Sequence, residues 1–122
     1  KPRRRGKGYF NHQCSIWARE TKDNFKWLVD HTLEMFTERM YRWPDSNEHF
    51  TKTFIQWCGK NIHNTIMSKT GLTNYAVAIS NDCDCRNIEN FDNLSTIDKY
   101  REYIRHDKDF ATWTLRWKPT WY

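Results

Sequence analysis

Residues 11–44 read NHQCSIWARETKDNFKWLVDHTLEMFTERMYRWP and contain the longest amphipathic pattern of the chain. From residue 25 onward, apolar side chains recur at intervals of three and four residues, which is the spacing of one face of an α-helix. These positions are Phe25, Leu28, Val29, Leu33, Phe36, Met40 and Trp43. Thr21 or Asp23 can cap this helix at its start, and Pro44 cannot continue it. The stretch therefore predicts one long helix as the main support of the fold.

A short helix is predicted immediately before the long one. Ser15 can cap a helix that runs through Glu20 and turns Arg19 and Glu20 toward a face of their own. His12 and the indole of Trp17 lie in the same short stretch of sequence. Because this spacing gathers titratable and aromatic side chains, we expect the candidate site here.

Two further helices are expected. Asp45 and Glu48 have the spacing of a capping box, and the helix that they open would end at Gly59. Its core-facing residues would be Phe50, Phe54, Ile55 and Trp57. Ser95 and Asp98 mark the start of the last helix. Its apolar positions would be Ile97, Tyr100, Ile104, Ala111 and Leu115.

The chain between these helices, residues 60–93, is rich in Asn, Thr, Ser and Asp and has little periodicity. Within it, residues 75–79 are apolar and favour either a short strand or a helical turn. We predict a mainly α fold: a compact bundle of three to four helices with an aromatic core and a long irregular segment. Residues 9–122 are expected to form a single α-helical domain behind a basic flexible arm, residues 1–8.

Aromatic residues outnumber Leu, Ile and Val together, so the predicted core is largely aromatic. The number of Trp and Tyr residues also suits surfaces that stack on nucleic-acid bases. We name Trp17, Trp121 and Tyr122 as candidates for such contacts, with packing in the core as the alternative.

The net charge of +5 comes from the N-terminal arm, because the remaining Lys and Arg residues are balanced by Asp and Glu. The cations of the arm are Lys1, Arg3, Arg4, Arg5 and Lys7. A cationic arm without apolar residues is typical of a segment that binds phosphate, so we expect it to contact DNA. The alternative is a tail that only increases solubility.

Metal and membrane sites are not expected. Cys83 and Cys85 lack the second close pair of ligands that a zinc site requires, and no cofactor signature is present. No apolar run reaches the ~18 residues of a membrane span, and none resembles a signal peptide. We expect an intracellular protein.

Three motifs follow one another in the first third of the chain: NH at residues 11–12, WARET at 17–21 and NFKWL at 24–28. This order resembles a group of small proteins of tailed phages, which usually read N-H-P-x-x-x-W-A-R-x-S and then N-Y-x-W-L. The likeness continues in Tyr41, Arg42, His49, residues 100–103, Lys108, residues 110–111, Trp113 and residues 119–121. It implies a phage-encoded protein in the cytoplasm of the host cell.

The chain also ends in PTWY, at residues 119–122, and has a His ahead of an Arg-Glu pair. In these features it is more distantly similar to the pyrimidine-dimer DNA glycosylases of the endonuclease V type. Those all-helical enzymes cut the glycosidic bond with an N-terminal amine as nucleophile and a first-helix Glu as the essential carboxylate. The resemblance implies that Arg19 and Glu20 take the Arg-Glu positions.

The residues themselves suit that chemistry. A glycosidic bond breaks through a cation-like transition state, so Glu20 can stabilise positive charge while Arg19 binds the adjacent phosphate. His12 and His49 are candidate acid-base groups, and Arg42 completes the predicted catalytic set. The alternative is that Arg19 and Glu20 form only surface ion pairs, worth ~0 to 1 kcal/mol.

Three classes of function remain open. The first is a phage-type enzyme that acts on a pyrimidine base, as a DNA glycosylase, lyase or base-modification enzyme. The second is a non-catalytic module that binds nucleic acid through the arm and exposed aromatic rings. The third is a small structural or inhibitory phage protein that binds another protein. Convergence of the predicted catalytic set on one cleft would favour the enzyme.

Overall fold

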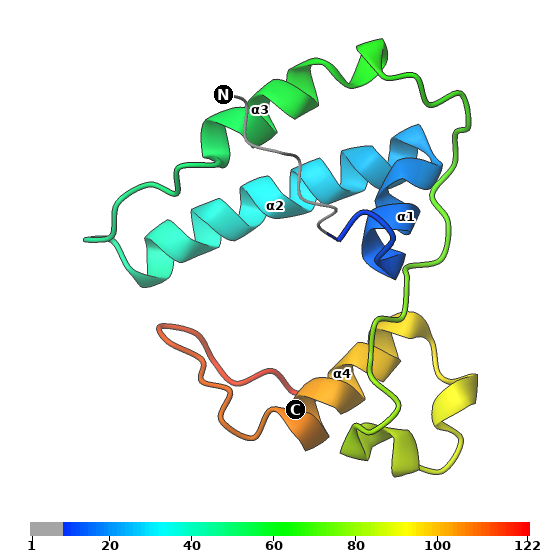
Figure 1. Cartoon of the computed structure of the whole chain (residues 1–122). Helices are drawn as coiled ribbons and strands as arrows, with labels where there is room; N and C mark the ends of the chain where they lie inside the picture. Colours follow the sequence, from blue (N-terminus) through cyan, green and yellow to red (C-terminus); the bar gives the residue numbers. More distant parts are fainter. Residues whose placement is uncertain (1–8) are drawn as a thin grey trace, which may run out of the picture. The chain divides into compact units, whose positions relative to one another are not determined.

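The computed structural model describes residues 9–122, so the predicted phosphate contacts of the arm, Arg3, Arg4, Arg5 and Lys7, lie outside the described residues. The prediction of a mainly α fold is confirmed. Four α-helices and three short 3-10 helices make up the regular structure of residues 9–122, and no strand is present among them (Figure 1).

The described chain groups into two compact units, the first ending at Thr73 and the second comprising Asn74–Tyr122. Each unit has buried residues of its own. Trp17, Ala18 and Val29 are buried in the first unit. Ile79, Cys85 and Phe91 form the core of the second. The expected division into an arm, residues 1–8, and one domain, residues 9–122, stays a prediction.

Helices α1 (Gln13–Glu20) and α2 (Lys22–Arg42) are separated by a single residue, Thr21. The hydroxyl of Thr21 accepts a hydrogen bond from the Asn24 amide at 3.0 Å, which confirms it as the predicted cap of the long helix. The predicted cap of α1 was wrong. His12 takes that place, because its backbone is still extended and its Nδ1 accepts from the Cys14 amide at 3.2 Å.

Helix α3 (Lys52–Lys60) lies beside α2 in Figure 1. A Cβ atom on Gly59 would lie 3.2 Å from Cγ1 of Val29, so glycine permits this close approach. Gly59 is the penultimate residue of the helix, whereas we predicted that the helix would end there. The predicted capping box of Asp45 and Glu48 is also wrong, because α3 starts later, with no side-chain cap.

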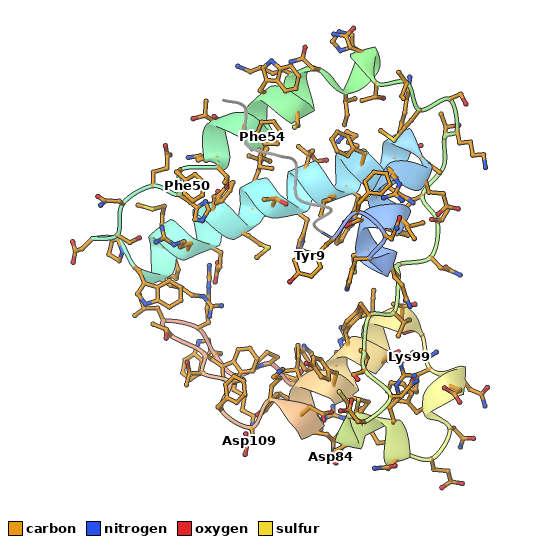
Figure 2. The ribbon with its side chains drawn as sticks, viewed as in Figure 1. Tyr9, Phe50, Phe54, Asp84, Lys99 and Asp109 are labelled. Carbon is orange, nitrogen blue, oxygen red and sulfur yellow. The ribbon has the colours of Figure 1, made fainter. Side chains whose placement is uncertain are left out.

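Aromatic side chains of α3 and the turn before it are exposed, which corrects the prediction that they face the core. Phe50 is 88% exposed, and Phe54 and Trp57 are more than half exposed. Figure 2 labels Phe50 and Phe54. The Phe54 and Trp57 rings stack on each other, with centroids 6.3 Å apart. No residue of α3 is fully buried, although the helix contacts α2, and Ile55 is half-buried.

After α3 and the short 3-10 helix η1 (Ile62–Asn64), the chain returns to the corner between α1 and α2. The Lys22 amide donates to the carbonyl of Lys69 at 3.0 Å, and the Thr21 hydroxyl donates to the carbonyl of Gly71 at 2.8 Å. The Gly71 amide donates to the carboxylate of Asp23. These bonds fasten residues 69–73 to the corner.

In the second unit, an irregular segment precedes two 3-10 helices, η2 (Asp84–Asn87) and η3 (Phe91–Asn93), and then α4 (Thr96–Asp107). Residues 75–79 form neither the strand nor the helical turn that we weighed. The hydroxyl of Tyr100 donates to the Ala76 carbonyl at 2.8 Å and accepts from the Ala78 amide at 2.9 Å. A side chain of α4 thus makes backbone hydrogen bonds that a neighbouring strand would otherwise make.

The start of α4 is as predicted, because the Ser95 hydroxyl accepts from the Asp98 amide at 3.1 Å. Its end is earlier than predicted. Lys108 leaves the helical backbone, and Leu115 has a positive φ of 55°. The Asp107 carboxylate instead accepts from the amides of Asp84 and Cys85, at 2.7 and 3.0 Å, and anchors η2 to the end of α4; Figure 2 labels Asp84.

Candidate functional site

Glu20 and Arg19 end α1 and are both exposed. Their side chains do not form the surface ion pair that we considered as the alternative. Arg19 donates to the carbonyl of Phe10, and its guanidinium carbon lies 4.1 Å from the centre of the Phe10 ring. Among residues 9–122, no ion pair includes Arg19 or Glu20. The carboxylate of Glu20 is therefore not neutralised by a described cation.

The partner of Glu20 is a neutral hydroxyl. Thr73 Oγ1 donates to Glu20 Oε2 at 3.1 Å and accepts from Asn24 Nδ2 at 2.8 Å. The Asn24 side chain is fully buried, with 0% of the residue exposed. Its Nδ2 also donates to the Trp17 carbonyl at 2.9 Å, and its Oδ1 accepts from the Thr73 amide at 2.9 Å. These bonds connect the exposed carboxylate with the interior of the first unit.

His12, the third member of the predicted set at this end of the unit, has a structural role as the cap of α1. The Tyr9 ring lies edge-on to its imidazole, with centroids 6.0 Å apart. His12 caps and Glu20 ends a helix of 8 residues, so the two lie about 12 Å apart along the helix at about 1.5 Å per residue. The structure therefore places them on one short helix without direct contact.

Arg42 and His49 lie far from Glu20. Helix α2 has 21 residues and is roughly 30 Å long, and Arg42 is its last residue. Arg42 forms an ion pair with Glu38 at 2.7 Å. His49 stacks on the rings of Phe36 and Phe50, at centroid distances of 5.6 and 4.8 Å. The five predicted catalytic residues thus do not converge on one cleft.

Trp17 is 8% exposed and packs edge-on against Trp27, with ring centroids 5.6 Å apart. Its indole Nε1 donates to the carbonyl of Thr73 at 3.4 Å. Because the ring is enclosed, Trp17 has the packing role that we gave as the alternative to base stacking.

Trp121 and Tyr122 belong to an aromatic cluster of the second unit. Trp113 contacts both rings edge-on, at centroid distances of 6.2 and 5.3 Å. Two cations lie over the cluster, the Arg101 guanidinium 5.6 Å from the Trp121 ring and the Lys118 ammonium 4.5 Å from the Tyr122 ring. The two rings predicted to stack on bases therefore contact cations from α4 and from the C-terminal segment.

Asn24 and Thr73 are the residues of the site that the sequence did not reveal. Asn24 belongs to the NFKWL motif. The sequence alone does not distinguish an Asn that is buried from one on a helix surface, where Asn also occurs often. Thr73 lies 53 residues from Glu20, in an irregular segment without periodicity. Only the return of the chain to the α1–α2 corner brings them together.

No group of three or more His, Cys, Asp and Glu side chains within residues 9–122 is arranged to hold a metal ion. In the same part of the chain, no helix has the length and apolar character needed to cross a membrane. Comparisons with protein-family models, with curated proteins and with solved structures found no match.

Proposed function

We propose that this protein acts on DNA and cleaves the bond between a pyrimidine base and its sugar, with Glu20 as the essential carboxylate. The observation that supports this proposal best is the state of Glu20: exposed, held by a neutral hydroxyl, and unpaired with any described cation. A carboxylate kept only for a surface ion pair would have a cation as its partner.

The chemistry requires such a group. As the glycosidic bond breaks, positive charge develops on the sugar, and a fixed carboxylate stabilises it more in the transition state than in the bound substrate. A neutral donor orients the carboxylate and leaves its negative charge available. The guanidinium of Arg19, on the adjacent residue, supplies a cation for the flanking phosphate.

The nucleophile in this proposal is an amine. An amine that attacks C1′ of the sugar displaces the base, which leaves with a proton from the amine. The C1′–O4′ bond of the sugar ring then breaks, O4′ takes the second amine proton, and C1′ and the nitrogen form an imine, which borohydride reduces to a stable adduct. The candidates are the N-terminal amine, Lys22 and Lys26. Lys26 forms an ion pair with Asp30, which makes Lys22 the better of the two lysines.

The test is the Glu20→Gln variant with ultraviolet-irradiated duplex DNA and DNA with modified pyrimidines. We expect strand cleavage and borohydride adduct to fall by at least roughly 100-fold, because charge stabilisation is lost in the transition state. DNA affinity should stay within about twofold. Glu34→Gln, an exposed carboxylate on α2, is the matched control and should behave as the wild type.

A wild-type rate for Glu20→Gln would contradict the proposal. So would the absence of both cleavage and adduct with the wild-type protein on all of these substrates.

A second candidate function, binding of nucleic acid without catalysis, is favoured by the aromatic cluster of the second unit. Aromatic rings beside cations can stack on bases while the cations approach phosphate. In this case Lys118→Ala and Trp121→Ala would weaken binding of single-stranded DNA, and Glu20→Gln would change nothing. The Glu20 assay therefore separates the two candidates.

A further inference from the structure

The orientation of the Asn24 amide is determined by its partners. The Thr73 backbone N–H can only donate, so the Asn24 atom that faces it at 2.9 Å is the oxygen, Oδ1. The Trp17 carbonyl can only accept, so the atom that faces it at 2.9 Å is Nδ2. The second proton of Nδ2 then points to the Thr73 hydroxyl, 2.8 Å away.

This amide in turn determines where the Thr73 hydroxyl proton points. A hydroxyl has one proton to donate, and one lone pair of Oγ1 is occupied by the Asn24 amide. The proton is directed to Glu20 Oε2, at 3.1 Å. The hydrogen-bond chain therefore has one direction, from the buried Asn24 through Thr73 to the exposed carboxylate.

We infer that Thr73, oriented by Asn24, is a positioning residue for Glu20. This inference rests on the proposed function. Glu20 is the last residue of α1 and exposed, and such a side chain ordinarily samples several rotamers. A single directed hydrogen bond selects one of them, and catalytic groups must be held close to their productive geometry.

The segment that carries Thr73 does not depend on this one hydroxyl. The carbonyls of Lys69 and Gly71 accept from the Lys22 amide and the Thr21 hydroxyl. The backbone amide of Thr73 donates to Asn24 and does not involve the side-chain hydroxyl. Removal of the Thr73 hydroxyl should therefore release Glu20 without releasing the segment.

The test compares Thr73→Val, which keeps the shape of the side chain and loses the hydroxyl, with Thr73→Ser, which keeps the hydroxyl. On the DNA substrate of the Glu20 assay we expect kcat of the Val variant to fall by roughly 10-fold with KM unchanged. The Ser variant should stay within about twofold of the wild type. A merely structural role would not produce this split between kcat and KM or the rescue by Ser.

A second readout does not need activity. In the NMR spectrum, the Glu20 Hα–Hβ couplings should indicate one rotamer in the wild type and in Thr73→Ser, and rotamer averaging in Thr73→Val. The backbone amide proton at position 73 is bonded to Asn24, so its slow exchange should persist in all three proteins. That persistence would show that the segment remains in place.

The outcomes are distinguishable. A wild-type rate for Glu20→Gln removes the proposed function, and the couplings then still decide whether Thr73 orients the carboxylate. An inactive Glu20→Gln together with a wild-type kcat for Thr73→Val overturns the positioning role. Glu20 couplings that are averaged in the wild type, or unchanged in Thr73→Val, also overturn it.

Discussion

Cys85, in the core of the second unit, is a thiol that the fold keeps protonated. Its residue is 0% exposed, and burial together with the Asp107 carboxylate raises the pKa of the thiol to about 12. The same carboxylate accepts the amides of Asp84 and Cys85, so one acidic side chain both anchors η2 and disfavours the thiolate. Because of this arrangement, we expect the stability of the second unit to depend on pH in the alkaline range.

We predict that the free energy of unfolding falls as pH rises above about 9. The thiol loses its proton in the unfolded chain near its ordinary pKa of 9.0 but keeps it in the folded chain up to about 12, so the unfolded state binds fewer protons in this window. At about pH 10.5 the loss should reach about 2 kcal/mol relative to pH 8. Urea unfolding at the two pH values measures it, with Cys85→Ala as the control.

Any other group that changes its protonation in the same window does so in both proteins. The difference between wild type and Cys85→Ala therefore isolates the thiol. An equal pH dependence of the two proteins would contradict the assignment.

At the scale of single residues, the sequence predicted Glu20 and Arg19 as a pair but not how they are held. The two side chains have partners at positions 10 and 73, and no local pattern connects these positions. Arg42 and His49 were placed in the same predicted set because a motif gives order along the chain and not distance in space. The length of α2 separates Arg42 from Glu20.

At the scale of elements, α2 and the start of α4 were predictable because their signals are local. Caps at Thr21 and Ser95 and an apolar repeat of three and four residues depend only on neighbours in sequence. The start of α3 and the course of residues 75–79 were not predictable. The first lacks a capping side chain, and the second is held by Tyr100, more than 20 residues away.

The contact between α2 and α3 supports a prediction about Gly59. Gly→Ala inside a helix ordinarily stabilises by roughly 1 kcal/mol, but a methyl group here would lie 3.2 Å from the buried Val29. We expect Gly59→Ala to destabilise the first unit by about 1 kcal/mol, because crowding outweighs helix propensity. In a Val29→Ala background, the same change should stabilise by about 1 kcal/mol.

Urea unfolding of the four proteins completes a double-mutant cycle. If Gly59→Ala has the same effect in both backgrounds, the two helices do not meet at this point.

At the scale of the whole molecule, charge is the property that the sequence predicts most directly. Deletion of residues 1–7 removes the excess cations, so we expect lower affinity for duplex DNA and a weaker salt dependence. Counterion release gives a slope of roughly −0.9 per phosphate contacted, and loss of the arm should flatten the slope by up to roughly 4.5. Binding titrations across a range of salt concentrations measure both.

The control is a protein in which a Gly/Ser arm of equal length replaces residues 1–7. It should behave as the deletion does. A slope that is the same with and without the cations would identify the arm as a solubilising tail.

The division of the chain has a consequence for how its gene can change. Thr73 is the last residue of the first unit, and every described hydrogen bond of Glu20 and Thr73 lies within that unit. An exchange of residues 74–122 by recombination after codon 73 would therefore leave every described side-chain partner of Glu20 encoded in the retained part of the gene.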